Sequence, residues 1–217
     1  MSCPFKPKWE RRKQARPQEL LAAALDLFVE RGFAATRLDD VARAAGVSKG
    51  TLYLYFSSKE DLFKAVVRES IVPSIGRAEG IIDEFTGSTE ALFRLVAMSW
   101  WTDIGATKLS GLPKLMMAEE GNFPELANFY QDEVVSRGEK LVASILARGM
   151  ARSEIRTVNL EIDTRLLVAP MIMMMMWKHS SGMCQVPAAQ LGTYLEHYIE
   201  MALHGLLIKP TASTAAN

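Results

Sequence analysis

Residues 46–56 read GVSKGTLYLYF, and this stretch decides how the N-terminal part of the chain folds. Ser48 suits the N-cap of a helix, because its side-chain oxygen can accept a bond from a free backbone N–H in the first turn. A helix is therefore predicted from Lys49. Gly46 can adopt positive φ and close a preceding helix. The stretch predicts one helix end, a tight turn and a second helix start.

The second helix has an inner and an outer side. Val47 and Leu52 occupy the two positions of a hydrophobic staple, and Leu52 and Phe56 lie four residues apart, so both can pack inward. Gly50 is costly inside a helix, but its missing side chain allows close approach to a phosphate or a base edge. The outer residues are Lys49, Gly50, Tyr53 and Leu54.

Two more helices are predicted before this turn. Apolar residues between Gln18 and Arg31 follow the 3.6-residue period of a helix, and Gly32 marks its end. Thr36 with Asp39 forms a variant of the capping box, which places the start of the next helix here. Residues 18–56 are therefore expected to form three short helices.

A fourth helix follows residues 46–56. Ser57 with Glu60 again matches a capping box, so this helix is expected to begin around Lys59 and to continue into the rest of the chain as a shared element. Lys59 lies at a helix N-terminus, where free N–H groups and the helix dipole favour a DNA phosphate.

The run from Thr36 to Leu62, T-x-x-x-x-V-A-x-x-A-G-V-S-K-G-T-L-Y-x-Y-F-x-S-K-E-x-L, resembles the DNA-binding domain of TetR-family transcriptional regulators. The resemblance covers roughly residues 16–64. It implies a helix-turn-helix within Asp39–Phe56, with residues 48–55 in the major groove. It also implies backbone phosphate contacts by Thr36, Tyr55 and Lys59. The DNA-binding residues expected on this basis are Thr36, Ser48, Lys49, Gly50, Thr51, Tyr53, Leu54, Tyr55 and Lys59.

Several of these residues have a structural alternative. Tyr55 lies three residues from Leu52 and alternatively packs the small helical core. Lys59 alternatively is an ordinary solvated lysine, and Thr36 alternatively only caps its helix. Leu54 can touch a thymine methyl, although the sequence does not identify the base.

Charge supports the same location for the DNA contact. The whole chain carries 25 basic and 25 acidic side chains, but residues 1–64 carry 12 Lys and Arg against 8 Asp and Glu. Residues 1–16 are expected to form a basic flexible arm that neutralises phosphates or enters a minor groove. The alternative is a solvated, disordered tail, which Pro4, Pro7 and Pro17 favour.

The remaining chain is long and apolar enough for a second, helical domain. The expected fold is all-α, with a DNA-binding domain at 17–64, an effector-binding and dimerisation domain at 65–210 and a flexible tail at 211–217. No run of 18 uncharged apolar residues, signal pattern or cysteine framework occurs, so a cytoplasmic protein without a membrane partner is expected. The expected helices span 59–85 with a possible kink at Pro73, 88–105, 108–120, 124–151, 159–180 and 187–208.

The last two helices are expected to form a homodimer. The helix from Glu161 carries two neighbouring apolar stripes, one with Leu166, Pro170, Met173 and Trp177 and one with Leu167, Met171 and Met174. One stripe suffices for a small domain, so the second indicates burial against another surface. The alternative is ordinary core packing. The face expected on the final helix contains Leu191, Leu195, Tyr198, Ala202 and Gly205.

An aromatic and thioether set suits a hydrophobic small molecule, because methionine adapts to irregular shapes. The same residue types at helical spacing more often form a core. Trp100 and Trp101 are adjacent and cannot point the same way. The candidate ligand-binding residues are Phe93, Met98, Trp100, Trp101, Met116, Met117, Phe129, Tyr130, Met173 and Trp177.

The sequence therefore predicts a homodimeric repressor that a hydrophobic effector releases from a palindromic DNA operator. No metal-ligand or nucleophile-base constellation occurs, so no metal, cofactor or catalytic residue is expected. Two alternatives stand beside this interpretation. One is a constitutive DNA-binding regulator without an effector, and the other is an all-helical enzyme.

Overall fold

The computed structural model describes residues 8–180 and 186–208, and within these ranges the chain is helical. The described residues contain no β-strand, only an isolated bridge between Ile155 and Leu207. The all-α prediction is therefore confirmed. The chain divides into two compact units. The first contains residues up to Pro73 together with Lys108–Val134, and the second contains Ser74–Thr107 and the chain from Val135 onward.

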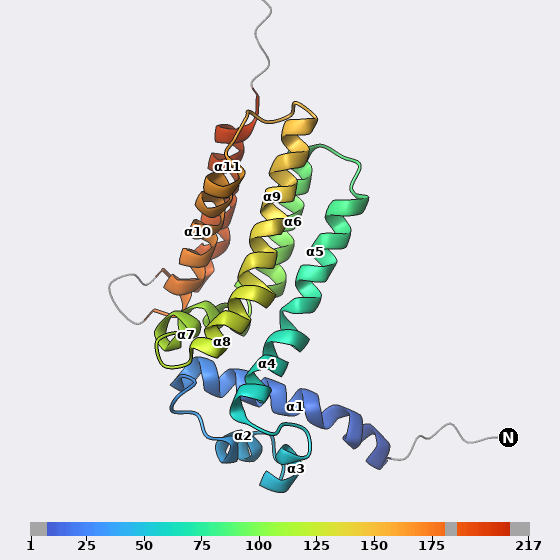
Figure 1. The fold of residues 1–217 in the computed structure, drawn as a ribbon, viewed down its shortest axis with the longest axis vertical. Coiled ribbons are helices and arrows are strands. Elements are labelled where there is room, and N and C mark those ends of the chain that lie inside the picture. Colours follow the sequence, from blue (N-terminus) through green and yellow to red (C-terminus); the bar gives the residue numbers. More distant parts are fainter. Residues whose placement is uncertain (1–7, 181–185, 209–217) are drawn as a thin grey trace, which may run out of the picture. The chain divides into compact units, whose positions relative to one another are not determined.

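The first unit differs from the expected domain because it includes a later segment. Residues 108–134 were expected in an effector domain that begins at residue 65, but they pack with the N-terminal helices. The elements of this unit are α1 (Lys8–Arg31), α2 (Leu38–Ala44), α3 (Lys49–Tyr53), α4 (Lys59–Ser70), the 3₁₀ helix η2 (Lys108–Gly111), α7 (Leu112–Glu119) and α8 (Pro124–Tyr130) (Figure 1).

Aromatic rings form the centre of the first unit. Phe28, Phe33 and Phe63 are fully buried, and their ring centroids lie 5.4 to 5.8 Å apart. Phe123, which precedes α8, lies edge-on to Phe33 at 4.7 Å. Tilted and edge-to-face pairs of this kind add to the free energy gained by burying the rings. The later segment thus contributes directly to the core of the helix-turn-helix unit.

Helix α1 begins earlier than the sequence predicted. It starts at Lys8 rather than Gln18 and continues through Pro17. A proline inside a helix removes one backbone donor, but the surrounding KWERRKQAR segment is rich in strong helix formers. Residues from Lys8 onward are therefore helical rather than part of a flexible arm. Residues 1–7 and the expected tail at 211–217 lie outside the described residues.

Both capping-box predictions beside residues 46–56 are wrong by one residue. The N-cap of α2 is Arg37, without a side-chain cap bond, because the hydroxyl of Thr36 bonds elsewhere. The N-cap of α4 is Ser58, whose oxygen accepts the Asp61 N–H at 3.0 Å. Ser57 instead donates its hydroxyl to the Asp61 carboxylate. The predicted start of α4 at Lys59 is nevertheless confirmed.

The shared helix predicted at 59–85 is two helices. α4 ends at Ser70 and α5 runs over Val72–Glu84. Pro73 has no N–H to donate to the preceding turn, and the break falls just before it, at Ile71.

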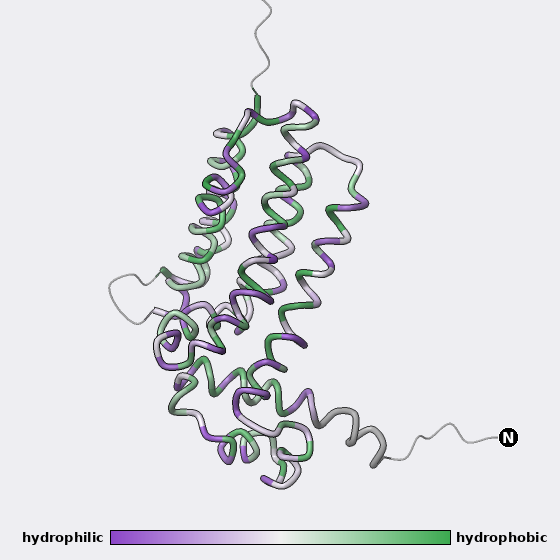
Figure 2. Tube along the Cα trace, in the orientation of Figure 1, coloured by the Kyte–Doolittle hydropathy of each residue, from purple (hydrophilic) through white to green (hydrophobic). Residues whose placement is uncertain are grey.

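The second unit is a set of helices along which hydrophobic and hydrophilic residues are interspersed (Figure 2). Most predicted spans agree with its helices. Its elements are α5 (Val72–Glu84), α6 (Thr89–Trp100), the π-helix η1 (Trp101–Gly105), the π-helix η3 (Gln131–Val135), which begins in the first unit, α9 (Ser136–Ala151), α10 (Leu160–Lys178), the 3₁₀ helix η4 (Ala188–Gln190) and α11 (Leu191–Leu206).

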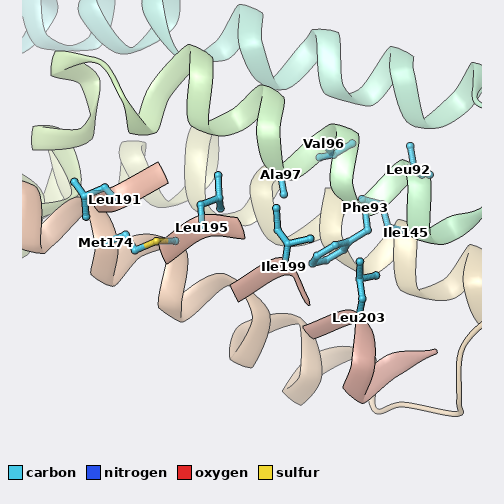
Figure 3. Close-up of a cluster of buried hydrophobic side chains, with 10 residues drawn as sticks. All are labelled: Leu92, Phe93, Val96, Ala97, Ile145, Met174, Leu191, Leu195, Ile199 and Leu203. Atoms are coloured by element: carbon cyan, nitrogen blue, oxygen red, sulfur yellow. The ribbon is translucent and has the colours of Figure 1, made fainter. Parts of the chain in front are cut away.

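The core of the second unit lies between α6, α9, α10 and α11. Aliphatic side chains of α6 and α11 point toward each other, with Phe93 among them (Figure 3). Met174 of α10 and Ile145 of α9 complete the cluster. The buried members are Leu92, Phe93, Val96, Ala97, Ile145, Met174, Leu191, Leu195, Ile199 and Leu203.

Candidate nucleic-acid interface

The helix-turn-helix is built as the sequence predicted. Gly46 has φ of +66° and ends α2, and the N–H of Val47 donates to the Ala42 carbonyl at 2.9 Å. Ser48 caps α3 by accepting the Thr51 N–H at 3.1 Å. Only a residue that tolerates positive φ fits position 46 without strain. The turn therefore fixes where the five-residue helix α3 begins.

The predicted inner side of α3 is confirmed, because Leu52 is fully buried. The outer side is open: Tyr53, Leu54 and Tyr55 are exposed by 46%, 83% and 38%. This exposure argues against Tyr55 as a core residue. Three of the side chains expected to read DNA are therefore accessible to a partner.

Gly50 has space around it. A Cβ built at this position would meet nothing closer than the Ser48 oxygen at 3.9 Å. Packing within the unit therefore does not require glycine at position 50. A glycine at this position would instead allow a partner molecule to approach the backbone closely.

The ammonium of Lys49 is held by two neighbours. Its Nζ lies 2.8 Å from Asp39 Oδ1 and 3.0 Å from Oδ2, and it lies 5.9 Å from the centre of the Tyr53 ring. The hydrogen bond to Asp39 raises the pKa of Lys49 above its ordinary value. Asp39 was predicted only as part of a helix cap, so its contact with Lys49 was missed. Lys49 remains exposed and charged.

Thr36 is not placed to touch a phosphate with its side chain. It is 2% exposed, and its hydroxyl lies 2.7 Å from the Gly32 carbonyl and 3.2 Å from the Leu27 carbonyl. The hydroxyl therefore ties the end of α1 to the turn that leads into α2. This burial contradicts the expected phosphate contact.

Lys59 also bonds within the unit. Its Nζ donates to the carbonyls of Phe33 at 2.7 Å, Ala34 at 3.1 Å and Thr36 at 3.1 Å, and it lies 4.5 Å from the centre of the Phe33 ring. Burial lowers the pKa of Lys59. An ammonium has three donors. A phosphate contact by Lys59 must therefore replace one of these carbonyls.

The same turn between α1 and α2 is also held by Glu119 at the end of α7. Glu119 is only 8% exposed, and its Oε1 accepts the N–H of Ala34 at 2.9 Å. Asn122 donates to the other carboxylate oxygen at 3.3 Å. We call Lys59, Glu119 and Phe123 the turn clamp, because they hold residues 32–37 from α4 and from the α7–α8 segment.

The clamp role of Glu119 was not predicted, although the sequence holds a signal for it. Leu112, Leu115 and Met116 define the buried stripe of α7, and Glu119 takes the next position of that stripe. An acid at a core position is rarely buried without a partner. The spacing could have indicated a buried acid, but not its partner 85 residues away.

The ten residues proposed for a ligand are divided between the two units. The first unit holds Met116, Met117, Phe129 and Tyr130, and the second holds the other six. Met98, Met117 and Met173 are exposed, whereas Phe93, Met116 and Tyr130 are buried. Neither unit therefore contains all ten residues. The second unit contains Phe93, Met98, Trp100, Trp101, Met173 and Trp177.

Some of these side chains have defined neighbours. The rings of Trp100 and Trp101 lie 6.1 Å apart, and Trp101 and Trp177 pack against the core of the second unit. Phe129 lies beneath two cations of α4, 5.7 Å from Lys64 Nζ and 5.0 Å from the Arg68 guanidinium. Phe93 and Phe129 thus already have packing roles.

The π-helix η1 is closed by a lysine. Lys178 Nζ donates to the carbonyls of Gly105 at 3.1 Å, Ala106 at 2.6 Å and Thr107 at 2.8 Å, and burial lowers its pKa. π-helical turns often lie at functional sites. The segment that follows Trp101 is therefore anchored to the end of α10.

The two stripes predicted on α10 have different surroundings. Leu167 and Met171 pack against the core of the second unit, and Met174 is 3% exposed. Leu166 and Met173 are exposed by 64% and 47%. One stripe faces the unit's own core. The other is exposed at Leu166 and Met173, whereas its last member, Trp177, packs against that core.

The face predicted on α11 follows the alternative of ordinary core packing. Leu191 and Leu195 are buried in the unit's own core, and Tyr198 and Ala202 pack against it. Gly205 alone of the five is exposed. The apolar residues that α11 exposes are instead Tyr194 and Met201, at 44% and 75%.

Over residues 8–180 and 186–208, no group of three His, Cys, Asp or Glu side chains could hold a metal ion. In the same part of the chain, no helix has the length and apolar character needed to cross a membrane.

Comparison with known proteins gives concordant matches. A family model described as bacterial regulatory proteins, tetR family, matches residues 20–66. The HTH-type transcriptional repressor KstR2 of Mycolicibacterium smegmatis is 31% identical over 161 residues, which cover 69% of this chain and 71% of the relative. The fatty acid metabolism regulator protein of Bacillus subtilis is 27% identical over 146 residues, 66% of this chain and 74% of the relative.

Solved structures share the fold. The regulator FadR from Bacillus subtilis, solved in complex with stearoyl-CoA, superposes with a TM-score of 0.70 at 19% identity over 87% of this chain and 98% of that chain. The ketosteroid regulator KstR2 of Mycobacterium tuberculosis gives a TM-score of 0.67 at 20% identity over 89% and 96%. At these identities the similarity shows the fold.

Proposed function

Because the chain belongs to the TetR family of bacterial regulatory proteins, we propose that it is a homodimeric repressor released from a palindromic operator by a hydrophobic small molecule. The family consists of DNA-binding transcriptional regulators, and this chain is one of them rather than an enzyme. Dimerisation, the palindromic operator and the small-molecule effector are the properties that we propose. A regulator of bacterial transcription works beside the chromosome, so we place it in the cytoplasm.

The open surface of α3 is the observation that carries the DNA-reading role. A lysine, two tyrosines and a leucine are presented beyond a capped helix start, and no side chain stands at Gly50. Tyr53 and Leu54 suit contacts to base edges, including the thymine methyl, and Lys49 suits a phosphate or a guanine. The proposed contact set is Ser48, Lys49, Gly50, Thr51, Tyr53, Leu54 and Tyr55.

The uncovered stripe of α10 supports the dimer. Ile162, Leu166 and Met173 lie four and seven residues apart and are exposed by 58%, 64% and 47%. Tyr194 and Met201 lie seven residues apart on α11 and are also exposed. Contiguous apolar surface of this kind marks an interface. Two copies of α10 and α11 would form a symmetric four-helix interface and would present two α3 helices to half-sites about 34 to 36 Å apart.

The proposed effector is a molecule with a large apolar part. The apolar second unit contains Phe93, Trp101 and Trp177, together with adaptable methionines. FadR of Bacillus subtilis was solved with stearoyl-CoA, and KstR2 is named a ketosteroid regulator. Acyl chains and steroid rings are both apolar, so they define the class of compound to try first.

The turn clamp supports a route from effector to DNA. The α7–α8 segment holds the turn before α2 through Glu119 and Phe123. A ligand that moves this segment would therefore also move α2 and α3. A coupling of about 1 to 3 kcal/mol would change operator affinity by roughly 5- to 150-fold.

One experiment tests the proposal directly. The full-length protein selects its site from random duplex DNA, and sedimentation measures how many copies bind. Fatty acyl-CoA esters and CoA esters of steroids are then added to the complex. We expect selection of an inverted repeat by two copies of the chain and release by at least one compound class.

Lys49→Ala is the matched variant for DNA reading, because Lys49 is exposed and its loss leaves the core intact. We expect weaker binding to the selected site with an unchanged melting temperature. Selection of a non-repeated site by a single copy contradicts the dimer. Binding that no compound weakens favours the constitutive regulator instead.

A further inference from the structure

An acidic residue, Asp39, lies on the surface that we propose contacts DNA. Asp39 is in the first turn of α2, 51% of its side chain is exposed, and both carboxylate oxygens lie within 3.0 Å of the Lys49 ammonium. The neighbouring acid, Asp40, instead pairs with Arg31 and Arg43. Asp39 therefore places a negative charge beside a cation proposed to contact DNA, where a phosphate would repel it.

This ion pair has little value for the stability of the unit. Both side chains are more than half exposed, at 58% for Lys49 and 51% for Asp39, and exposed pairs of this kind are screened by water and salt. The cap of α3 is supplied separately by Ser48. An acid in the first turn of α2 also interacts favourably with the helix dipole, but Asp40 lies in the same turn, and neither effect requires the pairing of Asp39 with Lys49.

We propose that Asp39 is a specificity-determining residue. It orients Lys49 over Tyr53 and cancels the attraction of Lys49 to DNA on which α3 is not aligned with the operator bases, which we call a site out of register. The inference rests on the proposed reading of DNA by α3. The ammonium has three donors, and the two oxygens of Asp39 leave at least one free. At a site in register, an acceptor atom of the DNA bonds to the free N–H of Lys49 while the Lys49–Asp39 ion pair stays in place. A site out of register gains the phosphate only by breaking the pair and by bringing the carboxylate against the DNA backbone.

The proposal predicts a measurable change in salt dependence. A neutral pair releases few counterions from DNA, whereas a free lysine on a phosphate steepens the slope of log K against log salt by about 0.9. Asp39→Asn should therefore steepen the slope for a scrambled duplex by about 0.9. Over a fourfold range of salt this is roughly a 3.5-fold additional change in affinity. With the selected-site slope unchanged, the ratio of selected-site to scrambled-site affinity should fall by roughly 3.5-fold more at the low end of this fourfold range than at its high end.

Two matched variants separate the pair from its charge. Asp39→Glu keeps a carboxylate within reach of Lys49 and should restore the wild-type slope and ratio. Glu69→Gln removes one negative charge from an exposed position of α4, in the same unit. It should move the slope for the scrambled duplex by less than half as much as Asp39→Asn.

A double-mutant cycle shows whether Asp39 acts through Lys49. In the Lys49→Ala background, Asp39→Asn should change the salt slope and the affinity ratio by less than half as much as in the wild-type background, because only the repulsion of the carboxylate by phosphate is left. An equal effect in both backgrounds overturns the proposal. Equal weakening on both duplexes with a lowered melting temperature also overturns it, because Asp39 then only joins α2 to α3. Failure of the wild-type protein to prefer any selected duplex instead overturns the DNA-reading function itself.

Discussion

Lys59 separates two roles that predict opposite results. The family resemblance assigns it to a phosphate, whereas the structure gives its ammonium three carbonyl partners in the turn between α1 and α2. Lys59→Met keeps most of the apolar stem and removes the charge. We expect this variant to destabilise the first unit, because three carbonyls lose a charged donor and the Phe33 ring loses its cation.

The size of the effect follows from the contacts. A hydrogen bond to a charged group contributes about 1.5 to 3 kcal/mol. Ala34 is exposed, so its carbonyl regains a bond to water, and the contributions do not add in full. We expect a loss of about 3 kcal/mol, roughly a 100-fold change in the unfolding equilibrium. Lys64→Met is the matched control, since Lys64 is also on α4 and its ring contact with Phe129 contributes only about 0.5 to 1 kcal/mol.

Urea unfolding followed by far-UV circular dichroism measures the stability, and operator binding at several salt concentrations gives the second readout. If Lys59 is a clamp, Lys59→Met lowers stability and leaves the salt slope as it is in the wild type. If Lys59 is a phosphate ligand, stability stays the same and the slope becomes shallower by about 0.9. The second result would refute the reasoning from the three carbonyls.

Three further predictions concern other parts of the chain. Met173→Arg places a charge on the uncovered stripe of α10 and should give monomers in sedimentation without loss of helix; an intact dimer would move the interface elsewhere. Glu154 is held by the Thr89 N–H, the Thr89 hydroxyl and an arginine, which lower its pKa to about 2, below the ordinary value of 4.5. Its stabilising effect is therefore present above pH about 4.5 and lost as pH falls toward 2, and Glu154→Gln should flatten this part of the pH–stability profile; a profile identical to the wild type would contradict it. Gly111→Ala places a Cβ 2.5 Å from a methyl of Val29 and should cost about 1 to 3 kcal/mol in urea unfolding, and an unchanged midpoint would show that α1 yields freely.

Local chemistry made the helix-turn-helix predictable. Ser48 and Gly46 act through atoms within a few residues of themselves, so their roles could be deduced from spacing alone. The caps at Thr36 and Ser57 failed because their hydroxyls have competing partners nearby, which spacing does not distinguish.

The remaining errors concern long-range packing. Periodicity found two apolar stripes on α10, but could not show which one its own core would cover. On α11 it chose the covered face, with Leu195 fully buried. The bond from Ala34 to Glu119 joins residues far apart in the chain, so no local pattern could reveal it. The grouping of residues 108–134 with the N-terminal helices was missed for the same reason.

That grouping has a practical consequence for building hybrid regulators. A graft that transfers only residues 1–64 to a foreign sensor would leave the Ala34 amide and the Phe33 ring facing helices that lack Glu119 and Phe123. Such a chimaera should bind its operator weakly and answer its new inducer poorly, even though every DNA-reading side chain is present. The portable module is the discontinuous one, in which residues 108–134 travel with the N-terminal helices and the recipient supplies the rest.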